Sequence, residues 1–120
     1  MKKVLITGST QGIGKALATA FVNNGYEVIV HCSKDLDKAI RVQSEIGAHQ
    51  AVACDLSNMD EVNELYAKTG AVDCLILNAS VQYKELWQDI TDGTFDTQFD
   101  VNVKSTLKLL KLFNNITKLI

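Results

Sequence analysis

Short, almost continuously apolar segments alternate with stretches of helical periodicity along the whole chain. These segments cover residues 3–7, 27–31, 50–54 and 72–77, and they are rich in valine and isoleucine. Strands buried on both faces have this composition, whereas strands with one solvated face alternate apolar and polar residues. Alternation of such strands with helices is typical of a parallel sheet covered by crossover helices. We therefore predict an α/β, Rossmann-type three-layer fold with right-handed crossovers and the strand order 3-2-1-4.

Helical spacing of apolar residues predicts three helices between these strands. They are expected within residues 13–24, 35–46 and 57–69, and a glycine follows each of them. Glycine readily takes the left-handed conformation that ends a helix. The first turn of the third helix is expected to be capped by Ser57 together with Asp60.

A last helix is expected to begin near residues 91–92 and to run nearly to the C-terminus. Its apolar residues recur at steps of three or four, which predicts one buried stripe. The stripe consists of Phe95, Phe99, Val103, Leu107 and Leu110. Asn102 falls on or beside this stripe, so its amide is expected to be buried and therefore hydrogen-bonded.

The fourth predicted strand has no partner on its outer side. The chain reaches Ile120 before a fifth strand is expected to finish, so residues 72–77 are predicted to form an edge of the sheet. This segment is too apolar for an exposed edge, where unpaired N–H and C=O groups promote association. We therefore expect the chain to be C-terminally incomplete or to self-associate. Because the sequence has no linker, repeat or proline, residues 1–120 are predicted to form a single domain.

The charge balance and the cysteines limit the classes of function. With 12 basic and 14 acidic residues spread along the chain, the net charge of −2 provides no basic surface for nucleic acid or an acidic membrane. The first apolar run ends after Ile6, so we expect neither an export signal nor a membrane span. The cysteines lack CxxC spacing, which predicts reduced packing residues, no metal site and a cytoplasmic location. His31 and His49 are expected to have packing or surface roles.

Gly8, Gly12 and Gly14 stand between the first strand and the first helix, where the chain reverses direction. Glycine permits the backbone conformations that such a turn needs. Backbone N–H groups at a helix N-terminus lack partners within the helix and carry partial positive charge, so this turn can bind a pyrophosphate. A tight turn without a ligand is the alternative interpretation. A phosphate-binding loop of the G-x-x-x-x-G-K-[ST] type is disfavoured, because Ala16 follows Lys15.

Four motifs follow one another at matching elements of the predicted fold. Residues 7–14 have the spacing T-G-x-x-x-G-I-G, Asp55 and Leu56 follow the third strand, residues 77–80 follow the fourth, and Asn102 lies in the last helix. In this order the motifs resemble the short-chain dehydrogenase/reductase family, nearest to its 3-oxoacyl-(acyl-carrier-protein) reductase branch. The family usually has N-N-A-G where this chain has L-N-A-S, so Asn78 matches while Leu77 and Ser80 depart from the pattern.

The resemblance implies hydride transfer between a nicotinamide dinucleotide and a carbonyl compound or secondary alcohol. It implies cofactor contacts in the glycine loop and after the third and fourth strands. These contacts fall on Gly8, Ser9, Gln11, Gly12, Ile13, Gly14, Asp55, Leu56, Asn78, Ala79 and Ser80. Among the family's catalytic positions only Asn102 is present, where it would position a water molecule or a lysine of a proton relay. Without the resemblance, a core amide bonded to backbone or water is the alternative for Asn102.

The family protonates its substrate with Tyr-x-x-x-Lys, assisted by a serine. None of the tyrosines of this chain, Tyr26, Tyr66 and Tyr83, has a lysine four residues later. The 120-residue chain by itself is therefore expected to be inactive, as the cofactor-binding half of such an enzyme. A non-catalytic nucleotide-binding or regulatory module and an inactive remnant are the alternatives. Family members commonly assemble through the last helix, so Leu109 and Leu112 are candidate residues of a homo-oligomer interface.

The end of the second strand predicts which dinucleotide binds. Acceptance of NAD needs a carboxylate there for the adenosine ribose, whereas NADP needs that carboxylate absent and a cation nearby. Cys32 occupies the position of the carboxylate, and Ser33 and Lys34 follow it. Ser33 could hydrogen-bond a 2′-phosphate and Lys34 could supply charge, so NADP(H) is predicted over NAD(H). The alternative is that Lys34 is an ordinary solvated residue, whose field the neighbouring Asp35 weakens.

Overall fold

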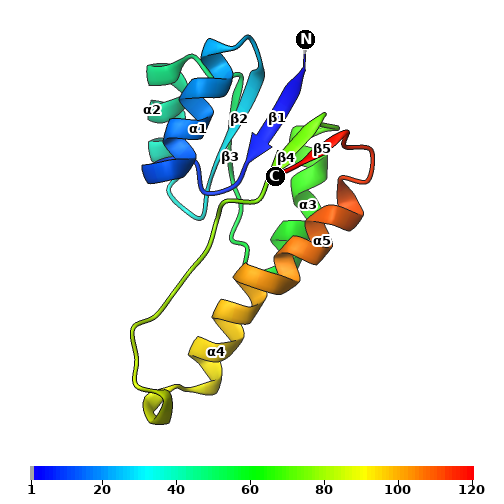
Figure 1. The fold of residues 1–120 in the computed structure, drawn as a ribbon. Coiled ribbons are helices and arrows are strands. Elements are labelled where there is room, and N and C mark those ends of the chain that lie inside the picture. The colour runs from blue at the N-terminus through cyan, green and yellow to red at the C-terminus, as the bar shows by residue number, and fades with distance from the viewer. Residues whose placement is uncertain (1) are drawn as a thin grey trace.

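A computed structural model describes residues 2–120 and shows a parallel sheet between two layers of helices (Figure 1). The sheet has the order β3-β2-β1-β4-β5, with β1 Lys3–Ile6, β2 Glu27–Cys32, β3 Gln50–Ala53, β4 Cys74–Ile76 and β5 Lys118–Leu119. The helices are α1 Gly12–Asn23, α2 Leu36–Ile46, α3 Met59–Thr69, α4 Asp92–Phe99 and α5 Ser105–Leu112, with a short turn η1 Trp87–Asp89 and a π-helical segment η2 Asp100–Lys104. The strand pairs are all parallel, which confirms the predicted Rossmann-type architecture.

The central strand, β1, has a layer of helices packed against each of its faces. In β1, Val4 and Ile6 belong to the apolar cluster beneath α1 and α2, while Leu5 belongs to the cluster beneath α3 and α5. Successive side chains of a strand point to opposite faces, so a strand covered on both sides must be apolar at every position. This arrangement explains the continuous apolar runs in the sequence.

The prediction that the fourth strand forms the sheet edge is wrong. β5 pairs with β4 in parallel, with Cys74 opposite Lys118 and Leu75 opposite Leu119. The Ile120 N–H donates to the Leu75 carbonyl oxygen at 2.9 Å. A strand of two residues has no apolar run of its own, and its pairing comes from the tertiary position of the chain after α5.

The cap of α3 is one residue away from the predicted one. Asn58 is the N-cap, and its Oδ1 accepts from the backbone N–H groups of Asp60 at 3.0 Å and Glu61 at 3.4 Å. Ser57 instead donates its hydroxyl to Asp55. Serine and asparagine are both good N-cap residues, and two such residues in sequence leave the start of a helix ambiguous by one position.

The last helix buries a different face from the predicted stripe, and it ends at Leu112 instead of continuing to the C-terminus. The buried row consists of Val101, Ser105, Leu109 and Phe113. The predicted stripe is largely solvent-exposed, since Phe95, Phe99, Val103 and Leu107 have exposed fractions of 59%, 48%, 53% and 55%. Two rows of side chains with a four-residue spacing run along this helix. The buried row was not recognised in the sequence because it contains a polar residue, Ser105.

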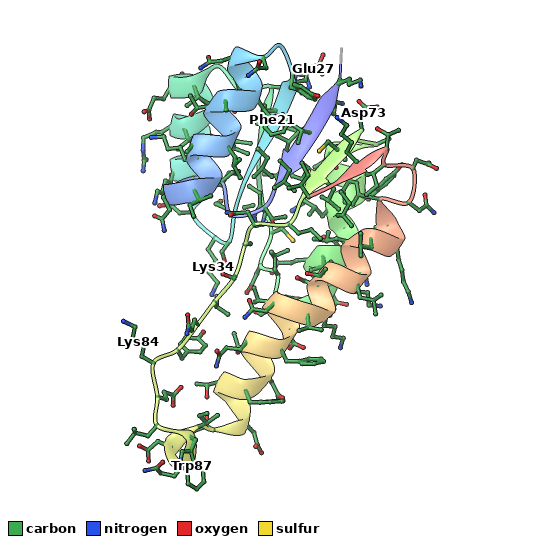
Figure 2. All side chains as sticks on the ribbon, in the orientation of Figure 1. Phe21, Glu27, Lys34, Asp73, Lys84 and Trp87 are labelled. Carbon is green, nitrogen blue, oxygen red and sulfur yellow. The ribbon has the colours of Figure 1, made fainter. Side chains whose placement is uncertain are left out.

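That serine is compatible with burial because its hydroxyl donates to the Val101 carbonyl oxygen at 2.6 Å. The predicted stripe is exposed partly because α4 extends beyond the sheet, and Trp87 lies at the far end of the molecule (Figures 1 and 2).

Leu109 is only 1% exposed within the core, and Leu112 packs against the same core. The prediction that Leu109 belongs to an interface is therefore wrong, whereas that for the partly buried Leu112 stays a prediction.

Substitution of Leu109 by alanine tests the corrected face. Because Leu109 is fully packed between α3 and the sheet, Leu109→Ala is expected to lower the free energy of unfolding by about 2–5 kcal/mol. The matched exposed variant, Leu107→Ala, is expected to lower it by less than about 1 kcal/mol. Urea denaturation of both variants measures the difference, and equal losses would contradict the assignment of the buried face.

No helix within residues 2–120 is long and apolar enough to cross a membrane. The cysteines are buried and carry free thiols, and burial, followed by the charge of Glu61, raises the pKa of Cys54 to about 11. Such a thiol stays protonated at neutral pH and is a poor nucleophile.

Candidate functional site

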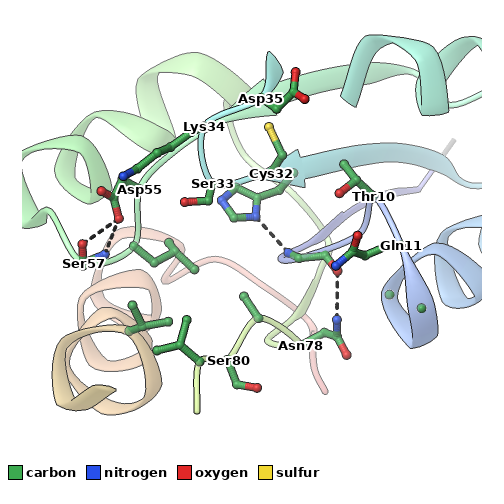
Figure 3. A pocket seen from close by; sticks show the side chains of 18 of the residues that line it. Thr10, Gln11, Cys32, Ser33, Lys34, Asp35, Asp55, Ser57, Asn78 and Ser80 are labelled. Atoms are coloured by element: carbon green, nitrogen blue, oxygen red, sulfur yellow. Dashed lines mark hydrogen bonds between the residues drawn. The ribbon is translucent and has the colours of Figure 1, made fainter. Parts of the chain in front are cut away.

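The carboxyl ends of β1 to β4 meet at one edge of the sheet, beside a cavity of about 670 Å³ (Figure 3). Ligands of open parallel sheets bind at this edge. The predicted cofactor residues that line the cavity are Gly8, Gln11, Gly12, Ile13, Gly14, Ser33, Lys34, Asp55, Leu56, Asn78, Ala79 and Ser80. Among the predicted residues, Ser9 and Asn102 do not line it. Thr10, His31 and Lys38 line it as well, although the sequence did not indicate them.

His31 connects the glycine loop to the ends of two strands. The Gly8 N–H donates to His31 Nδ1 at 2.9 Å, and His31 Nε2 lies 2.9 Å from the Cys54 carbonyl oxygen. Because Nδ1 must accept, the ring proton is on Nε2, which donates to Cys54, and the imidazole is neutral. Burial lowers the pKa of His31, which favours the same neutral form. His31 therefore has the packing role expected from the sequence and, in addition, a specific hydrogen-bonding role. The only indication of the second role in the sequence was the position of His31 at the end of the strand.

Ser9 fixes the loop from the inside. Its hydroxyl donates to the Ile6 carbonyl oxygen at 2.7 Å and accepts from the His31 backbone N–H at 2.8 Å. The side chain has no exposed surface. Ser9 thus holds the glycine loop against β2 and does not present its hydroxyl to the cavity.

Thr7 and Asn78 join the glycine loop to the segment after β4. The Thr7 hydroxyl accepts from the backbone N–H groups of Asn78 and Ala79, both at 3.0 Å. In return, Asn78 Nδ2 donates to the Gly8 carbonyl oxygen at 3.0 Å. The two loops on either side of the strand ends are therefore held as one unit.

Two glycines of the loop are needed for different reasons. A Cβ at Gly14 would overlap the Gly8 carbonyl oxygen and come within 2.6 Å of Asn78 Nδ2, so this position has no room for a side chain. Gly12 has a φ of +58° and faces open space on the cavity side. A ligand can therefore approach the backbone at Gly12 without meeting a side chain.

The N-terminus of α1 differs from the other helix starts that border the sheet edge. Its N-cap residue, Gln11, makes no side-chain capping bond, and the first turn holds no acidic residue. By contrast, Asp35 caps α2 and Asn58 caps α3 through side-chain hydrogen bonds. The first N–H groups of α1 thus remain available to an anion beside the cavity.

Charged side chains flank the far side of the cavity. Asp55 Oδ1 accepts from the Ser57 hydroxyl at 2.7 Å and from its backbone N–H at 3.0 Å. The hydroxyl bond above all, and then the backbone bond and the charge of Lys34, lower the pKa of Asp55. Figure 3 shows Lys34 extending toward this carboxylate. Within residues 2–120, no group of three or more His, Cys, Asp or Glu side chains is arranged to hold a metal ion.

Asn102 lies in the π-helical segment and faces the loop after β4. Its Nδ2 donates to the Val81 carbonyl oxygen at 2.8 Å, and its Oδ1 accepts from the Val81 N–H at 3.0 Å. The amide is satisfied, as expected, but the residue is exposed, so the prediction of a buried amide is wrong. A π turn displaces one helical residue from the regular α pattern, and such turns are frequent at functional sites.

The arrangement of the loops at the carboxyl edge of the sheet agrees with a comparison of the sequence with protein-family models. A family model for short chain dehydrogenases matches residues 2–117. The chain belongs to this family. The expected family resemblance is thereby confirmed, with residues of the glycine loop, Asp55 and Asn78 gathered at the cavity.

Several curated relatives are similar to this chain over most of its length. An uncharacterised oxidoreductase of Bacillus subtilis is 38% identical over 117 residues, which cover 93% of this chain and 44% of the relative. Glucose 1-dehydrogenase of Gluconobacter oxydans is 35% identical, with coverages of 88% and 43%. A 3-oxoacyl-(acyl-carrier-protein) reductase of Staphylococcus epidermidis is 30% identical, with coverages of 92% and 48%. The chain spans about half the length of the relatives it matches.

Solved structures with NADP bound have the same fold. A 3-oxoacyl-(acyl-carrier-protein) reductase from Agrobacterium tumefaciens superposes with a TM-score of 0.85 at 31% identity, covering 93% of this chain and 46% of that protein. A metagenomic short-chain oxidoreductase gives a TM-score of 0.84 at 29% identity, with coverages of 94% and 54%.

Replacement of Gly14 tests the contact between the two loops. Because a methyl group at this position would overlap the Gly8 carbonyl, Gly14→Ala is expected to lower the free energy of unfolding by about 1–3 kcal/mol. Gly93 in α4 is the control, since a Cβ there has no neighbour closer than 3.8 Å, and Gly93→Ala is expected to raise stability by up to about 1 kcal/mol. Chemical denaturation measures both, and an unchanged Gly14→Ala would refute the contact.

The lowered pKa of His31 predicts that the folded chain loses stability in weak acid. Because its pKa is lowered below the ordinary 6.5, the unfolded chain takes up a proton near that pH while the folded chain stays neutral. The free energy of unfolding should therefore fall as pH drops below about 6.5, by at most about 1.4 kcal/mol per pH unit for this residue. Urea titrations between about pH 7.5 and 5 measure the slope. The control, His31→Gln, keeps a donor and an acceptor but cannot titrate, and a slope as steep as that of the unchanged chain would contradict the prediction.

Proposed function

We propose that this chain is the cofactor-binding part of an NAD(P)-dependent oxidoreductase that transfers hydride between a nicotinamide dinucleotide and a carbonyl compound or secondary alcohol. The observation that carries the proposal is the N-terminus of α1, whose N–H groups are uncapped and border a cavity beside Gly12. A pyrophosphate fits such a helix end, because it is multiply charged and needs close approach to backbone donors. Membership of the short-chain dehydrogenase family supports the same class of ligand.

The residues around the cavity divide along the length of a dinucleotide. The glycine loop, residues 8–14, would hold the pyrophosphate. Asp55 and Leu56 at the end of β3 would lie near the adenine, and residues 78–80 after β4 would contact the nicotinamide half. The nicotinamide supplies or accepts the hydride when it is bound, and the contribution of these residues is to bind and orient it. Thr7 and Asn78 support this division, because their hydrogen bonds keep the pyrophosphate and nicotinamide segments in fixed relation.

NADP(H) is the preferred cofactor in this proposal. No carboxylate stands at Cys32, while Ser33 and Lys34 are exposed at the cavity mouth. Two solved relatives have NADP bound, which supports the same cofactor preference. Asp35 reduces the positive potential at this end of β2, but its carboxylate accepts the Lys38 N–H as the cap of α2.

Asn102 acts as a positioning residue. Its amide Nδ2 donates to the Val81 carbonyl oxygen and its Oδ1 accepts from the Val81 N–H, so it would fix the segment that carries the nicotinamide contacts. An asparagine has no titratable proton of its own, and any role in a proton relay would be through a water molecule or a lysine.

A non-catalytic nucleotide-binding module is the second candidate, because Tyr83, the tyrosine that lines the cavity, has Trp87 and not a lysine four residues later. Both candidates predict that the chain binds NADPH without turnover. They differ in the product of the complete gene, which should oxidise NADPH with some member of a panel of ketones and aldehydes if the enzyme proposal holds. Binding without oxidation in that protein would favour the second candidate.

Titration with NADPH and NADH tests the proposal directly. The chain is expected to bind NADPH roughly tenfold more tightly than NADH, because the 2′-phosphate adds a charge-assisted hydrogen bond. Cys32→Asp should reverse this preference by repelling the phosphate and accepting from the ribose hydroxyls, whereas the neutral control Cys32→Asn should not. Cofactor fluorescence or calorimetry gives both affinities. Binding of neither nucleotide would overturn the proposed function, and equal affinities would overturn the cofactor preference alone.

A further inference from the structure

Two lysines line the cavity near the end of β2, and of these two only Lys38 has its ammonium fixed by a hydrogen bond among the residues that the structure describes. Lys34 extends toward Asp55, and its charge contributes to the lowered pKa of that carboxyl (Figure 3). Lys38 lies on the first turn of α2, and its Nζ donates to Gln11 Oε1 at 2.7 Å. Its side chain is partly buried, whereas Lys34 is exposed.

The partner decides how much positive charge each lysine can offer to a ligand. The amide oxygen of Gln11 is neutral, so it orients the Lys38 ammonium without cancelling its charge, and the nearby Asp35 carboxylate bonds to the Lys38 backbone N–H and not to its ammonium. The ion pairs within residues 2–120 are Lys15 with Glu45 and His49 with Glu27, so neither Lys34 nor Lys38 is in one, and what distinguishes Lys38 is its hydrogen bond to Gln11.

The contact with Gln11 also places the Lys38 ammonium between two parts of the proposed site. Gln11 is the N-cap of α1, where the pyrophosphate would bind. Lys38 also acts on the end of β2, because burial and Asp35 raise the pKa of the Cys32 thiol while the charge of Lys38 lowers it. In this fold the adenosine ribose lies between the N-terminus of the first helix and the end of the second strand. A phosphate on the ribose 2′-oxygen would therefore enter the field of Lys38.

We propose that Lys38, oriented by Gln11, is the principal cation that recognises the 2′-phosphate of NADP(H). The proposal rests on the proposed function and assigns the discrimination to a residue of α2, outside the segment that directly follows β2. It gives Lys34 a smaller part, because no hydrogen bond within residues 2–120 fixes the exposed Lys34 ammonium at the start of α1. Gln11 is a positioning residue in this arrangement.

The test compares ligands that differ only in the 2′-phosphate. The full 120-residue chain is titrated with NADPH and NADH, and with adenosine 2′,5′-bisphosphate and adenosine 5′-monophosphate. Lys38→Met is expected to weaken NADPH and the bisphosphate roughly tenfold and to leave NADH and the monophosphate within about twofold. Lys38→Arg should retain most of the discrimination. Lys111→Met, an equal loss of charge on α5, should change neither affinity.

A second variant keeps Lys38 in place and does not depend on the folding of Lys38→Met. Gln11→Glu sets a carboxylate against the ammonium, and the ratio of NADPH to NADH affinity is expected to fall about tenfold. Thermal unfolding of every variant verifies that the fold is retained.

Different results would overturn different statements. If the unchanged chain prefers NADPH and Lys38→Met keeps that preference, or weakens both nucleotides equally, the role of Lys38 is refuted while the proposed function stands. Loss of the preference in Lys34→Met but not in Lys38→Met would assign the recognition to Lys34 instead. If the unchanged chain binds neither nucleotide, the proposed function and the role of Lys38 fall together.

Discussion

β1 is paired on both sides, with β2 and with β4, and the candidate site depends on this double pairing. The pairing continues past the end of the strand, because the Thr7 N–H donates to the Ile76 carbonyl oxygen and the Ser9 N–H to that of His31, both at 3.0 Å. The first residues of the glycine loop are thus tied alternately to the two neighbouring strands. A loop fixed in this way loses little conformational freedom when a ligand binds, which favours affinity.

Four polar side chains at or beside the cavity stabilise the backbone around it. Thr7, Ser9, His31 and Asn78 all direct their hydrogen bonds to main-chain groups of adjacent loops. The backbone of the glycine loop and the charged side chains of Lys34, Lys38 and Asp55 are among the groups that line the cavity. This division suits the binding of a long, anionic ligand, because rigid donors lower the cost of ordering it.

The sequence predicted the parts of the fold that depend on periodicity and the parts of the site that depend on glycine. Strands with both faces covered have no other apolar pattern available, so β1 to β4 and the order 3-2-1-4 could be inferred. The pairing of β5 depends on where α5 ends and could not be inferred from residues 118–119. The choice between the two apolar rows of the last helix required the position of the sheet.

Some site residues could likewise be predicted from the local sequence, whereas others depend on the tertiary structure. The spacing of the glycines identified the loop, but it could not separate Ser9, which is buried in hydrogen bonds, from Gln11, which lines the cavity. Likewise, Lys38 reaches the cavity only because α2 packs beside α1, a tertiary relation with no signature in the local sequence. Asn102 was identified through the family motif, whereas its partner Val81 follows from the course of the loop after β4.

The π turn at Asp100–Lys104 makes the length of the last helix as important as its composition. A chain one residue shorter at this point could form an uninterrupted α-helix, which would rotate α4 by about 100° relative to α5. Asn102 would then leave Val81, and the phenylalanines of α4 would turn to another side of the molecule. Point substitutions in this segment should consequently be far better tolerated during evolution than single-residue insertions or deletions, which are otherwise easily accepted near helix ends.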